Sequence, residues 1–475
     1  MHPAPWAQHE LGRAHLGDPR RTTRLIRLAS DLAAHPGDSL PAACGDWAAT
    51  KAAYRFFDDD GVDAGAIRDA HQAATLARLA PHPTVLVLQD TTALDFSTHP
   101  GLAGAGPMAR SPGYGVWLHS ALAASDAGVP LGLVDQQQWA RDATTTGKRH
   151  TRRARPTAEK ESQRWLDALT ATQALLTPPS HVVTVADREA DIYDLFALPR
   201  PATSDLLIRA AHNRRVSHEA RYLNEAVAAA PVAGLLPIAL HRADGRPPRE
   251  ATLAVRFVPL DLQPPRHHPQ RATLVPIPVV AILAEELAPP PGESPIRWLL
   301  LTTWRVMDLD EAVQCVRWYA ARWVVERFHY VLKQGCKVED LQLRTTDRLE
   351  RAVAVFTVVA WRLLWLTYLA REEPDLPCTV ALSDPEWRAL WATVHRRPDP
   401  PPTPPSLHQA VRWIAQLGGF LGRAGDGEPG AKVLWRGLRR LEDITLGWTV
   451  ARTSAGSTPP RLPPHPRASP VVGNG

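Results

Sequence analysis

Apolar residues recur at helical spacing in residues 1–70. Asp18 followed by Pro19 is typical of a helix start, an N-cap with a proline in the first turn. The apolar positions that follow have the spacing of one helix face: Leu25, Leu28, Ala29 and Leu32. HPGDSLP ends this helix, and DWAATKAAYRFFDD predicts a second one. Short basic helices around a turn suit nucleic-acid binding, and they suit a small helical bundle equally well.

The middle of the chain alternates apolar, strand-like runs with helical segments. TVLVLQD predicts a buried strand that ends at Asp90, and HVVTVAD predicts another that ends at Asp187. VWLHSALAAS and VPLGLVDQQQW suggest a hairpin, DLLIRAA suggests a third buried strand, and READIYDLF suggests a helix directly after Asp187. This alternation predicts an α/β fold with a central mixed sheet and flanking helices.

The pattern changes twice in the second half of the chain. Residues 232–303 contain strand-like runs separated by Pro- and Gly-rich turns, which predicts a β-rich insertion. The C-terminal third then returns to helical spacing before a tail rich in Pro, Ser and Gly. We therefore expect a helical domain at 1–70, a core at 71–365 that contains the insertion, a helical region at 366–452 and a disordered tail at 453–475.

Three acidic residues are candidates for a metal site. Asp90 and Asp187 each end a predicted strand, and ligands of open sheets bind beyond the carboxyl ends of the strands. With Glu326 they could supply the oxygen ligands that Mg²⁺ prefers. Two such ions can activate a water or a 3′-hydroxyl and stabilise the leaving oxygen of a phosphodiester. Alternatively, Asp90 is a turn residue or N-cap, Asp187 caps a helix, and Glu326 is an ion-pair partner of Arg322.

The segment YAARWVVERFHYVLKQG, residues 319–335, predicts one continuous helix with a charged stripe. At about 100° per residue, Tyr319, Arg322, Glu326 and Lys333 fall on one narrow face. A carboxylate flanked by cations on a single line suggests a site for phosphate and metal. The alternative is a solvated face with i,i+4 ion pairs, which is the usual meaning of such spacing.

The composition shows a mild basic excess, and the cysteine pattern favours a protein with reduced thiols. The formal net charge is +5 over 475 residues, which is compatible with a polyanionic partner. The four cysteines show no CxxC pair, which favours a reduced, cytosolic protein. The N-terminal residues lack the apolar stretch of a signal peptide, and we expect no apolar run long enough to span a membrane.

A family resemblance follows from three motifs taken together. DREADIYDLF, with DTT upstream and Tyr-x2-Arg-x3-Glu-x6-Lys downstream, resembles the DDE transposases of bacterial insertion sequences, and more narrowly their YREK subgroup. LGDPRRTTRL and AAYRFFDD resemble the DNA-binding segment of that family, ESPIRWLLLTT its β-insertion, and LWRGLRRLED its C-terminal region. The resemblance implies an RNase H-like catalytic core interrupted by a β-rich insertion, with helical N-terminal DNA-binding and helical C-terminal dimerisation domains.

The resemblance also implies a catalytic site and a reaction. Asp90, Asp187 and Glu326 would be the catalytic acids that hold up to two Mg²⁺ ions, for which Mn²⁺ would substitute. Hydrolytic nicking at a transposon end would free a 3′-hydroxyl, which would attack the opposite strand to give a hairpin. The hairpin would be reopened, and the same 3′-hydroxyl would attack target DNA. The implied partners are double-stranded DNA, both transposon ends and target, and a second copy of the chain in a homodimer, without a membrane and in the bacterial cytoplasm.

Several DNA contacts are implied in the same way. Arg322 and Lys333 would bind phosphates beside the cut, and Tyr319 could donate its hydroxyl to a phosphate oxygen. Trp298 matches the family position that stacks on a flipped base, although a strand tryptophan packed in the core is the alternative.

Further basic residues are candidates for phosphate contacts. Arg188, beside Asp187, and Arg209, after the third strand, might line the DNA path, and the basic loop KRHTRRAR is a plausible phosphate contact. A solvated loop is an equally simple explanation for either basic segment. Two other functions stay open, a standalone RNase H-like nuclease and a catalytically inactive DNA-binding inhibitor or domesticated relative.

Overall fold

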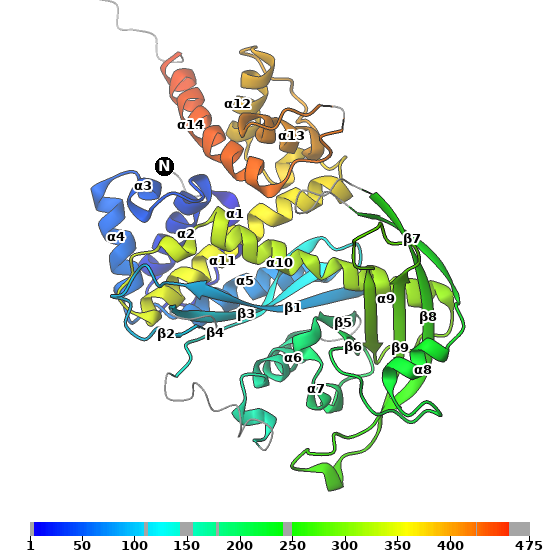
Figure 1. Ribbon diagram of the computed structural model, residues 1–475. Helices are drawn as coiled ribbons and strands as arrows, with labels where there is room; N and C mark the ends of the chain where they lie inside the picture. Colours follow the sequence, from blue (N-terminus) through cyan, green and yellow to red (C-terminus); the bar gives the residue numbers. More distant parts are fainter. Residues whose placement is uncertain are drawn as a thin grey trace, which may run out of the picture.

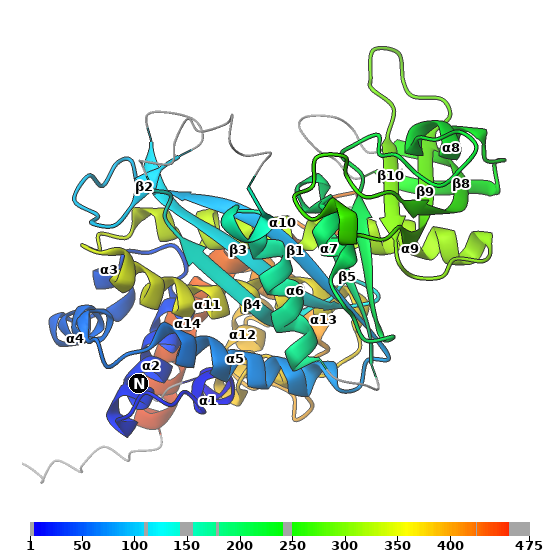
Figure 2. The same cartoon turned by 90° about the horizontal axis from the view of Figure 1, so that it is seen from below.

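The computed structural model describes residues 4–108, 113–142, 155–176, 180–240, 249–423 and 425–455. It is a mixed α/β structure in which helices cover both faces of a central sheet (Figures 1 and 2). Helical regions at the two ends of the chain lie against this core (Figure 1). The predicted fold class is confirmed, and the arrangement is consistent with an RNase H-like core.

Within the described residues, ten strands form one sheet in the order β2-β3-β1-β5-β6-β10-β9-β8-β7, and β4 pairs with β3. Only the β1–β5 and β5–β6 pairs are parallel. The strands are β1 Thr84–Asp95, β2 Gly106–Pro107, β3 Tyr114–Ser125, β4 Pro130–Trp139, β5 His181–Ala186, β6 Ser204–Arg209, β7 Gly234–Leu240, β8 Arg249–Leu262, β9 Ile277–Glu286 and β10 Arg297–Thr302. The β-rich segment thus continues the core sheet, because β10 pairs directly with β6.

The strand prediction at Asp90 is wrong in one respect. β1 continues to Asp95, so Asp90 lies inside the strand and not at its end. The extension exists because β3 pairs with β1 as far as Asp95, whereas the parallel partner β5 pairs only as far as Leu88. Asp187 directly follows β5, as predicted, and its side chain also caps the 3-10 turn η4 Arg188–Ala190.

The N-terminal region is helical, as the apolar spacing predicts. Asp18 caps the helix that begins at Pro19 by accepting a hydrogen bond from the backbone N–H of Arg20 at 2.8 Å. The helices before the sheet are α1 Pro5–Leu11, α2 Pro19–Ala34, α3 Leu40–Cys44, α4 Trp47–Asp58 and α5 Ala64–Leu79.

Different helices cover the two faces of the sheet. α10 and α11 lie on one face, and α6 and α7 lie on the other (Figure 1). The helical elements of this part are η3 Thr157–Glu159, α6 Gln163–Leu175, α7 Tyr193–Ala197, α8 Leu223–Ala229, η5 Arg271–Thr273, α9 Leu309–Ala321, α10 Trp323–Tyr330, η6 Val331–Gly335, η7 Val338–Asp340 and α11 Thr346–Glu372.

The helix predicted for residues 319–335 is not continuous. It is divided at Arg322, between α9 and α10, and its last turn η6 is a π-helix. The backbone of Arg322 keeps right-handed helical angles, so the axis continues while the hydrogen-bond ladder is interrupted. A π turn adds a residue to the ring closed by each hydrogen bond, so the 100° periodicity does not hold as far as Lys333.

The C-terminal region is helical, as predicted, although its first helix was not predicted individually. The helices are α12 Asp384–His395, α13 Leu407–Leu417 and α14 Ala431–Ala455, after the short turn η8 Cys378–Val380. α13 ends at Leu417, and Leu421 beyond it is 66% exposed. Ile414 is buried in the core. Residues 456–475 of the Pro-rich tail lie outside the described residues.

One helix corrects the expectation about membrane-spanning runs. α11 is long and apolar enough to cross a membrane by length and composition alone, but 83% of its apolar stretch is buried inside the protein. Its buried side chains belong to one core that also contains residues of the N-terminal helices, the sheet and α14. A helix surrounded by protein has apolar residues on all sides, which explains the composition.

Candidate functional site

Asp90 and Asp187 occupy equivalent positions on neighbouring strands. The parallel pairing of β1 with β5 ends at the pair Leu88–Val185, and each aspartate stands two residues further along. Side chains alternate along a strand, so each aspartate projects to the same face as the residue two before it. Leu88 and Val185 both belong to the core beneath α10 and α11. Both carboxylates therefore face the side of the sheet on which α10 lies.

Glu326 lies on α10, and Arg322 contacts both Glu326 and Asp90. The Arg322 guanidinium donates a hydrogen bond to Glu326 Oε1, and its Nη1 lies 3.9 Å from Asp90 Oδ1. The Arg322 side chain is 13% exposed, and those of Asp90 and Glu326 are 19% and 30% exposed. The i,i+4 ion pair between Arg322 and Glu326 is thus present, and it lies beside Asp90.

The electrostatics of the cluster are those of crowded negative charge. Burial raises the pKa of Asp187 above its usual range, and repulsion from Asp90 adds to this shift. Burial likewise raises the pKa of Glu326, with further contributions from Asp90 and Asp187, although Arg322 opposes the shift. Burial disfavours the Arg322 charge, but Glu326 and Asp90 outweigh it and raise the pKa of the guanidinium. Three acids that share one close cation would be stabilised by additional positive charge.

The donor atoms fit a hard divalent cation in their chemistry. All three acids offer carboxylate oxygens, which are the ligands that Mg²⁺ takes. Among the described residues, no three His, Cys, Asp or Glu side chains are close enough together to hold a metal ion. The arrangement of the three acids is thus looser than a coordination shell, with Arg322 in contact with two of them.

Lys333 lies further along the same side of β1. Its ammonium group donates to the carbonyl of Ala93 at 2.8 Å and pairs with Glu339 at 3.0 Å. The π turn η6 carries the side chain to this position. One face of the ammonium is therefore engaged by β1, and the side chain is 27% exposed.

Trp298 and Tyr319 form an aromatic contact beside the cluster. The rings meet edge to face with centroids 5.5 Å apart, and the Arg322 guanidinium carbon lies 5.8 Å from the Tyr319 centroid. Tyr319 is only 5% exposed, whereas Trp298 is partly buried and packs against the main core. The contacts thus run in sequence from Trp298 through Tyr319 and Arg322 to the acids.

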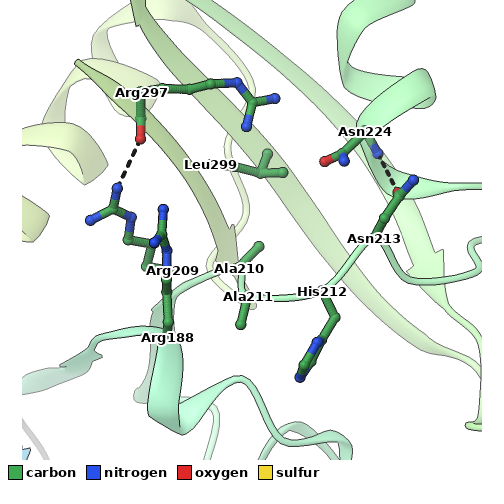
Figure 3. A pocket seen from close by; sticks show the side chains of 9 residues that line it. All are labelled: Arg188, Arg209, Ala210, Ala211, His212, Asn213, Asn224, Arg297 and Leu299. Atoms are coloured by element: carbon green, nitrogen blue, oxygen red, sulfur yellow. Dashed lines mark hydrogen bonds between the residues drawn. The ribbon is translucent and has the colours of Figure 1, made fainter. Parts of the chain in front are cut away.

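Arg188 and Arg209 line a basic pocket of about 180 Å³, together with Arg297 and His212 (Figure 3). Arg209 Nη2 donates to the carbonyl of Arg297 at 3.0 Å, drawn as a dashed line in Figure 3. Arg188 directly follows Asp187, so the pocket adjoins the acids. Residues 148–154 of the basic loop lie outside the described residues.

Three residues near the acids were missed in the sequence. Arg164 of α6 pairs with Glu189 at 2.6 Å and donates to Thr91 at 2.9 Å, on the opposite face of β1 from Asp90. Burial raises the pKa of Glu189, and Asp187 and Asp90 add to this shift, so Glu189 shares the field of the cluster. His329, on α10, lies 3.4 Å from Asp90. Its spacing of three residues from Glu326 was a usable signal, because such residues are neighbours on a helix.

Two segments of the chain match known protein families. Residues 3–62 match the family described as transposase DNA-binding, and residues 358–457 match the Tn5 transposase dimerisation domain. These matches support a Tn5-like transposase. DNA binding and homodimer formation are supported in the same way.

The matches leave the acidic cluster to be judged on its own geometry. The two matched segments lie at the ends of the chain, and Asp90, Asp187 and Glu326 lie between them. The first match includes α2 and α4, whose basic side chains Arg20, Arg24, Lys51 and Arg55 line one shallow pocket. Such a pocket is suited to contacts with DNA phosphates.

Proposed function

We propose that this chain is a DDE transposase of the YREK subgroup of insertion sequences. It binds the terminal inverted repeats of its element, cuts them through a hairpin intermediate and joins the 3′-hydroxyl ends to target DNA. The observation that carries the proposal is the acidic cluster. Asp90 and Asp187 lie two residues beyond the last β1–β5 pair, and Glu326 of α10 joins them through Arg322.

The three acids would hold up to two Mg²⁺ ions, with Mn²⁺ as a substitute. Bound ions would supply Lewis-acid stabilisation of the phosphodiester and activation of the attacking oxygen. The raised pKa values of Asp187 and Glu326 support this role. The carboxylates of a cation site repel one another when no cation is bound, and this repulsion raises their pKa values. A structural cluster would instead be expected to match each buried acid with a cation.

The cations around the cluster have separate roles in the proposal. Arg322 binds a phosphate beside the cut as a bidentate fork, and Lys333 binds one as a point charge. Arg188 and Arg209 bind the strand that enters the basic pocket next to Asp187. These contacts set the position of the DNA without reading its sequence.

Trp298 and Tyr319 form the side of the site at which the hairpin turns. A partly buried indole can offer one face to a base flipped out of the stack, which offsets part of the lost stacking energy. Tyr319 supports the edge of this ring and, through Arg322, couples its position to the acids. The Tyr319 hydroxyl donates to a phosphate oxygen in the proposed complex.

The partners and location follow from the same reaction. Two copies of the chain pair two transposon ends and then engage target DNA. We expect the protein to act in the bacterial cytoplasm on the nucleoid, in a reduced state and without a membrane partner. The burial of α11 inside the protein supports a structural role for that apolar helix.

The test uses the purified full chain, Mg²⁺ and a labelled duplex that carries the inverted repeat flanking its coding sequence. The expected products are nicked ends, hairpins and strand-transfer products. A duplex with a scrambled repeat and the Asp187→Ala variant are the matched controls, and both should give none of these products.

Two other outcomes would contradict the proposal and identify its competitors. Nicks without hairpins or strand transfer would indicate a standalone nuclease. Binding to the repeat without cleavage at any Mg²⁺ or Mn²⁺ concentration would indicate a catalytically inactive DNA-binding regulator.

A further inference from the structure

A chain of polar contacts leads from Asp90 into the core. His329 is buried on α10, and its ring nitrogen Nδ1 lies 3.4 Å from Asp90 Oδ2. The other ring nitrogen, Nε2, lies 3.2 Å from Ser120 Oγ. Gln136 Nε2 donates to the same Ser120 hydroxyl at 3.2 Å, and Thr357 Oγ1 donates to Gln136 Oε1 at 3.0 Å.

Sheet register brings these groups into one row. Asp90 of β1 stands opposite Ser120 of β3, and Ser120 stands opposite Gln136 of β4. Cross-strand partners project to the same face, so all three side chains point towards α10 and α11. His329 and Thr357 reach the row from those two helices.

One set of hydrogen-bond directions uses every donor and acceptor in this chain of contacts. Thr357 donates to the amide oxygen of Gln136, so the amide nitrogen of Gln136 faces Ser120. Ser120 accepts this bond and has its own proton for His329 Nε2. With Nε2 as the acceptor, the His329 ring carries its proton on Nδ1, which faces Asp90 Oδ2. A buried chain in which each group has a partner is rigid, because an unpaired member would lose its hydrogen bond without regaining water.

Asp90 therefore has two distinguishable oxygens. His329 lies on the Oδ2 side, and Arg322 lies on the Oδ1 side. A carboxylate whose rotation is restrained at one oxygen presents the other in a defined direction. Residues that restrain a ligating carboxylate in this way orient it for the metal, and their loss typically weakens metal binding or activity by about 10–100-fold.

We propose that His329 is a positioning residue that holds Asp90 Oδ2 and directs Oδ1 to the bound cation. Ser120, Gln136 and Thr357 hold His329 in turn. The inference rests on the proposed function, because it takes Asp90 as a metal ligand.

The test measures Mn²⁺ binding to the full chain without DNA, from the loss of the free-ion electron paramagnetic resonance signal. His329→Ala should weaken Mn²⁺ binding by about 10–100-fold. His329→Asn keeps an amide donor near the position of Nδ1 and should restore most of the affinity. His329→Gln keeps its donor near Nε2, on the Ser120 side, and should restore little.

Cleavage kinetics provide a second readout. His329→Ala should raise the Mg²⁺ concentration for half-maximal cleavage, whereas the rate at saturating Mg²⁺ recovers to within a few-fold of wild type. Ser120→Ala, which removes a single oxygen, should shift the Mg²⁺ requirement in the same direction by a smaller factor. It keeps the proposal testable if His329→Ala fails to fold.

His119→Asn is the matched control. His119 is a fully buried histidine on the same sheet, and its Nδ1 lies 2.9 Å from the Thr91 hydroxyl instead of a carboxylate. This variant should change stability and leave the Mn²⁺ affinity unchanged.

Two results would overturn the inference. One is equal Mn²⁺ affinity in wild type and His329→Ala, and the other is equal weakening by the Ala, Asn and Gln variants, which would indicate packing alone. Asp90→Asn separates this failure from that of the proposed function. If Asp90→Asn loses Mn²⁺ binding while the His329 variants do not, only the positioning role fails. If Asp90→Asn binds Mn²⁺ as wild type does, the proposed site itself fails.

Discussion

Two clusters of charged residues in this protein balance their charges in opposite ways. In the seam between α1 and α5, a single acid, Glu10, is paired with His71 at 2.8 Å and forms hydrogen bonds with Arg78. These partners outweigh the cost of burial and lower the pKa of Glu10 to about 2. In the site between the sheet and α10, Asp187 and Glu326 have raised pKa values, because burial and neighbouring acids outweigh Arg322.

The contrast separates a charge that stabilises the fold from charges held for a ligand. Glu10 is nearly inaccessible, and its partners come from α5, which packs against α1. The acids of the site are partly exposed and come from elements distant in sequence, held by the sheet against their mutual repulsion. Pockets with such perturbed acids are typical of functional sites. Each prediction below would break or sharpen this contrast.

The largest effect is expected for Asp187→Ala in single-turnover cleavage of a terminal-repeat duplex. Loss of a ligand should remove several kcal/mol of transition-state stabilisation, or at least about 1,000-fold in rate. Binding of the uncut duplex, measured by gel shift, should remain within a few-fold. Undiminished nicking would exclude Asp187 from the site.

The next effect is on stability. Glu10→Gln should lower the free energy of unfolding by about 3 kcal/mol, since it leaves the buried His71 and Arg78 without their counter-charge. The Mg²⁺ dependence of cleavage should not change. Urea titration at pH 7 measures the loss of stability. A loss as small as that expected for an exposed pair such as Arg423–Asp426 would contradict the stabilising role of Glu10.

Two tryptophans extend the comparison. Trp298→Ala should slow hairpin formation by about 5–100-fold, the value of stacking one base, and should leave first-strand nicking nearly intact. Trp361 packs on His71 and Arg78 in the seam, so Trp361→Phe is the matched control. It should lower stability and slow no single step selectively. Equal losses at both steps in Trp298→Ala would indicate a folding defect.

The smallest effect concerns the pH dependence of the free energy of unfolding, to which Glu10 and Asp187 should contribute with opposite signs. The lowered pKa of Glu10 means that its contribution to stability is complete above its ordinary value of 4.5 and is lost as the pH falls towards about 2. The raised pKa of Asp187 means that its ionisation costs stability as the pH rises through the shifted value. Asp187→Asn should therefore be slightly more stable than wild type at pH 7, by less than Glu10→Gln loses. If Asp187→Asn is less stable than wild type in the absence of metal, this prediction is wrong.

Local features of the fold could be predicted from the sequence, and long-range ones could not. Asp18 and Pro19 marked the start of α2, and the apolar run before Asp187 marked β5. The end of β1 was misjudged because the partner that extends it, β3, begins at Tyr114. The pairing of β10 with β6, which joins the β-rich segment to the core sheet, likewise depends on contacts distant in sequence.

One missed helix left a local signal. Ser383 and Glu386 form a capping box at the start of α12, with a proline in the first turn. Its apolar residues Trp387, Leu390, Trp391 and Val394 also recur at helical spacing.

The candidate site could be predicted from the sequence only in part. Strand ends and helix spacing indicated the three acids, but not how close they lie or that Arg322 divides the helix. The row of Asp90, Ser120 and Gln136 required the strand register, which no single segment contains. His329 could have been predicted as a neighbour of Glu326 from its helical spacing. Its role, however, depends on the row of Asp90, Ser120 and Gln136.

The most direct test of the central claim is a crystal structure of the chain with Mn²⁺ and a pre-cleaved terminal-repeat duplex, with the ions located by anomalous scattering. The account expects at least one peak bound by oxygens of Asp90 and of a second acid of the cluster, with the 3′-hydroxyl of the duplex beside it. Peaks bound only by other residues, or acids that stay apart with Arg322 between them and no ion, would contradict it.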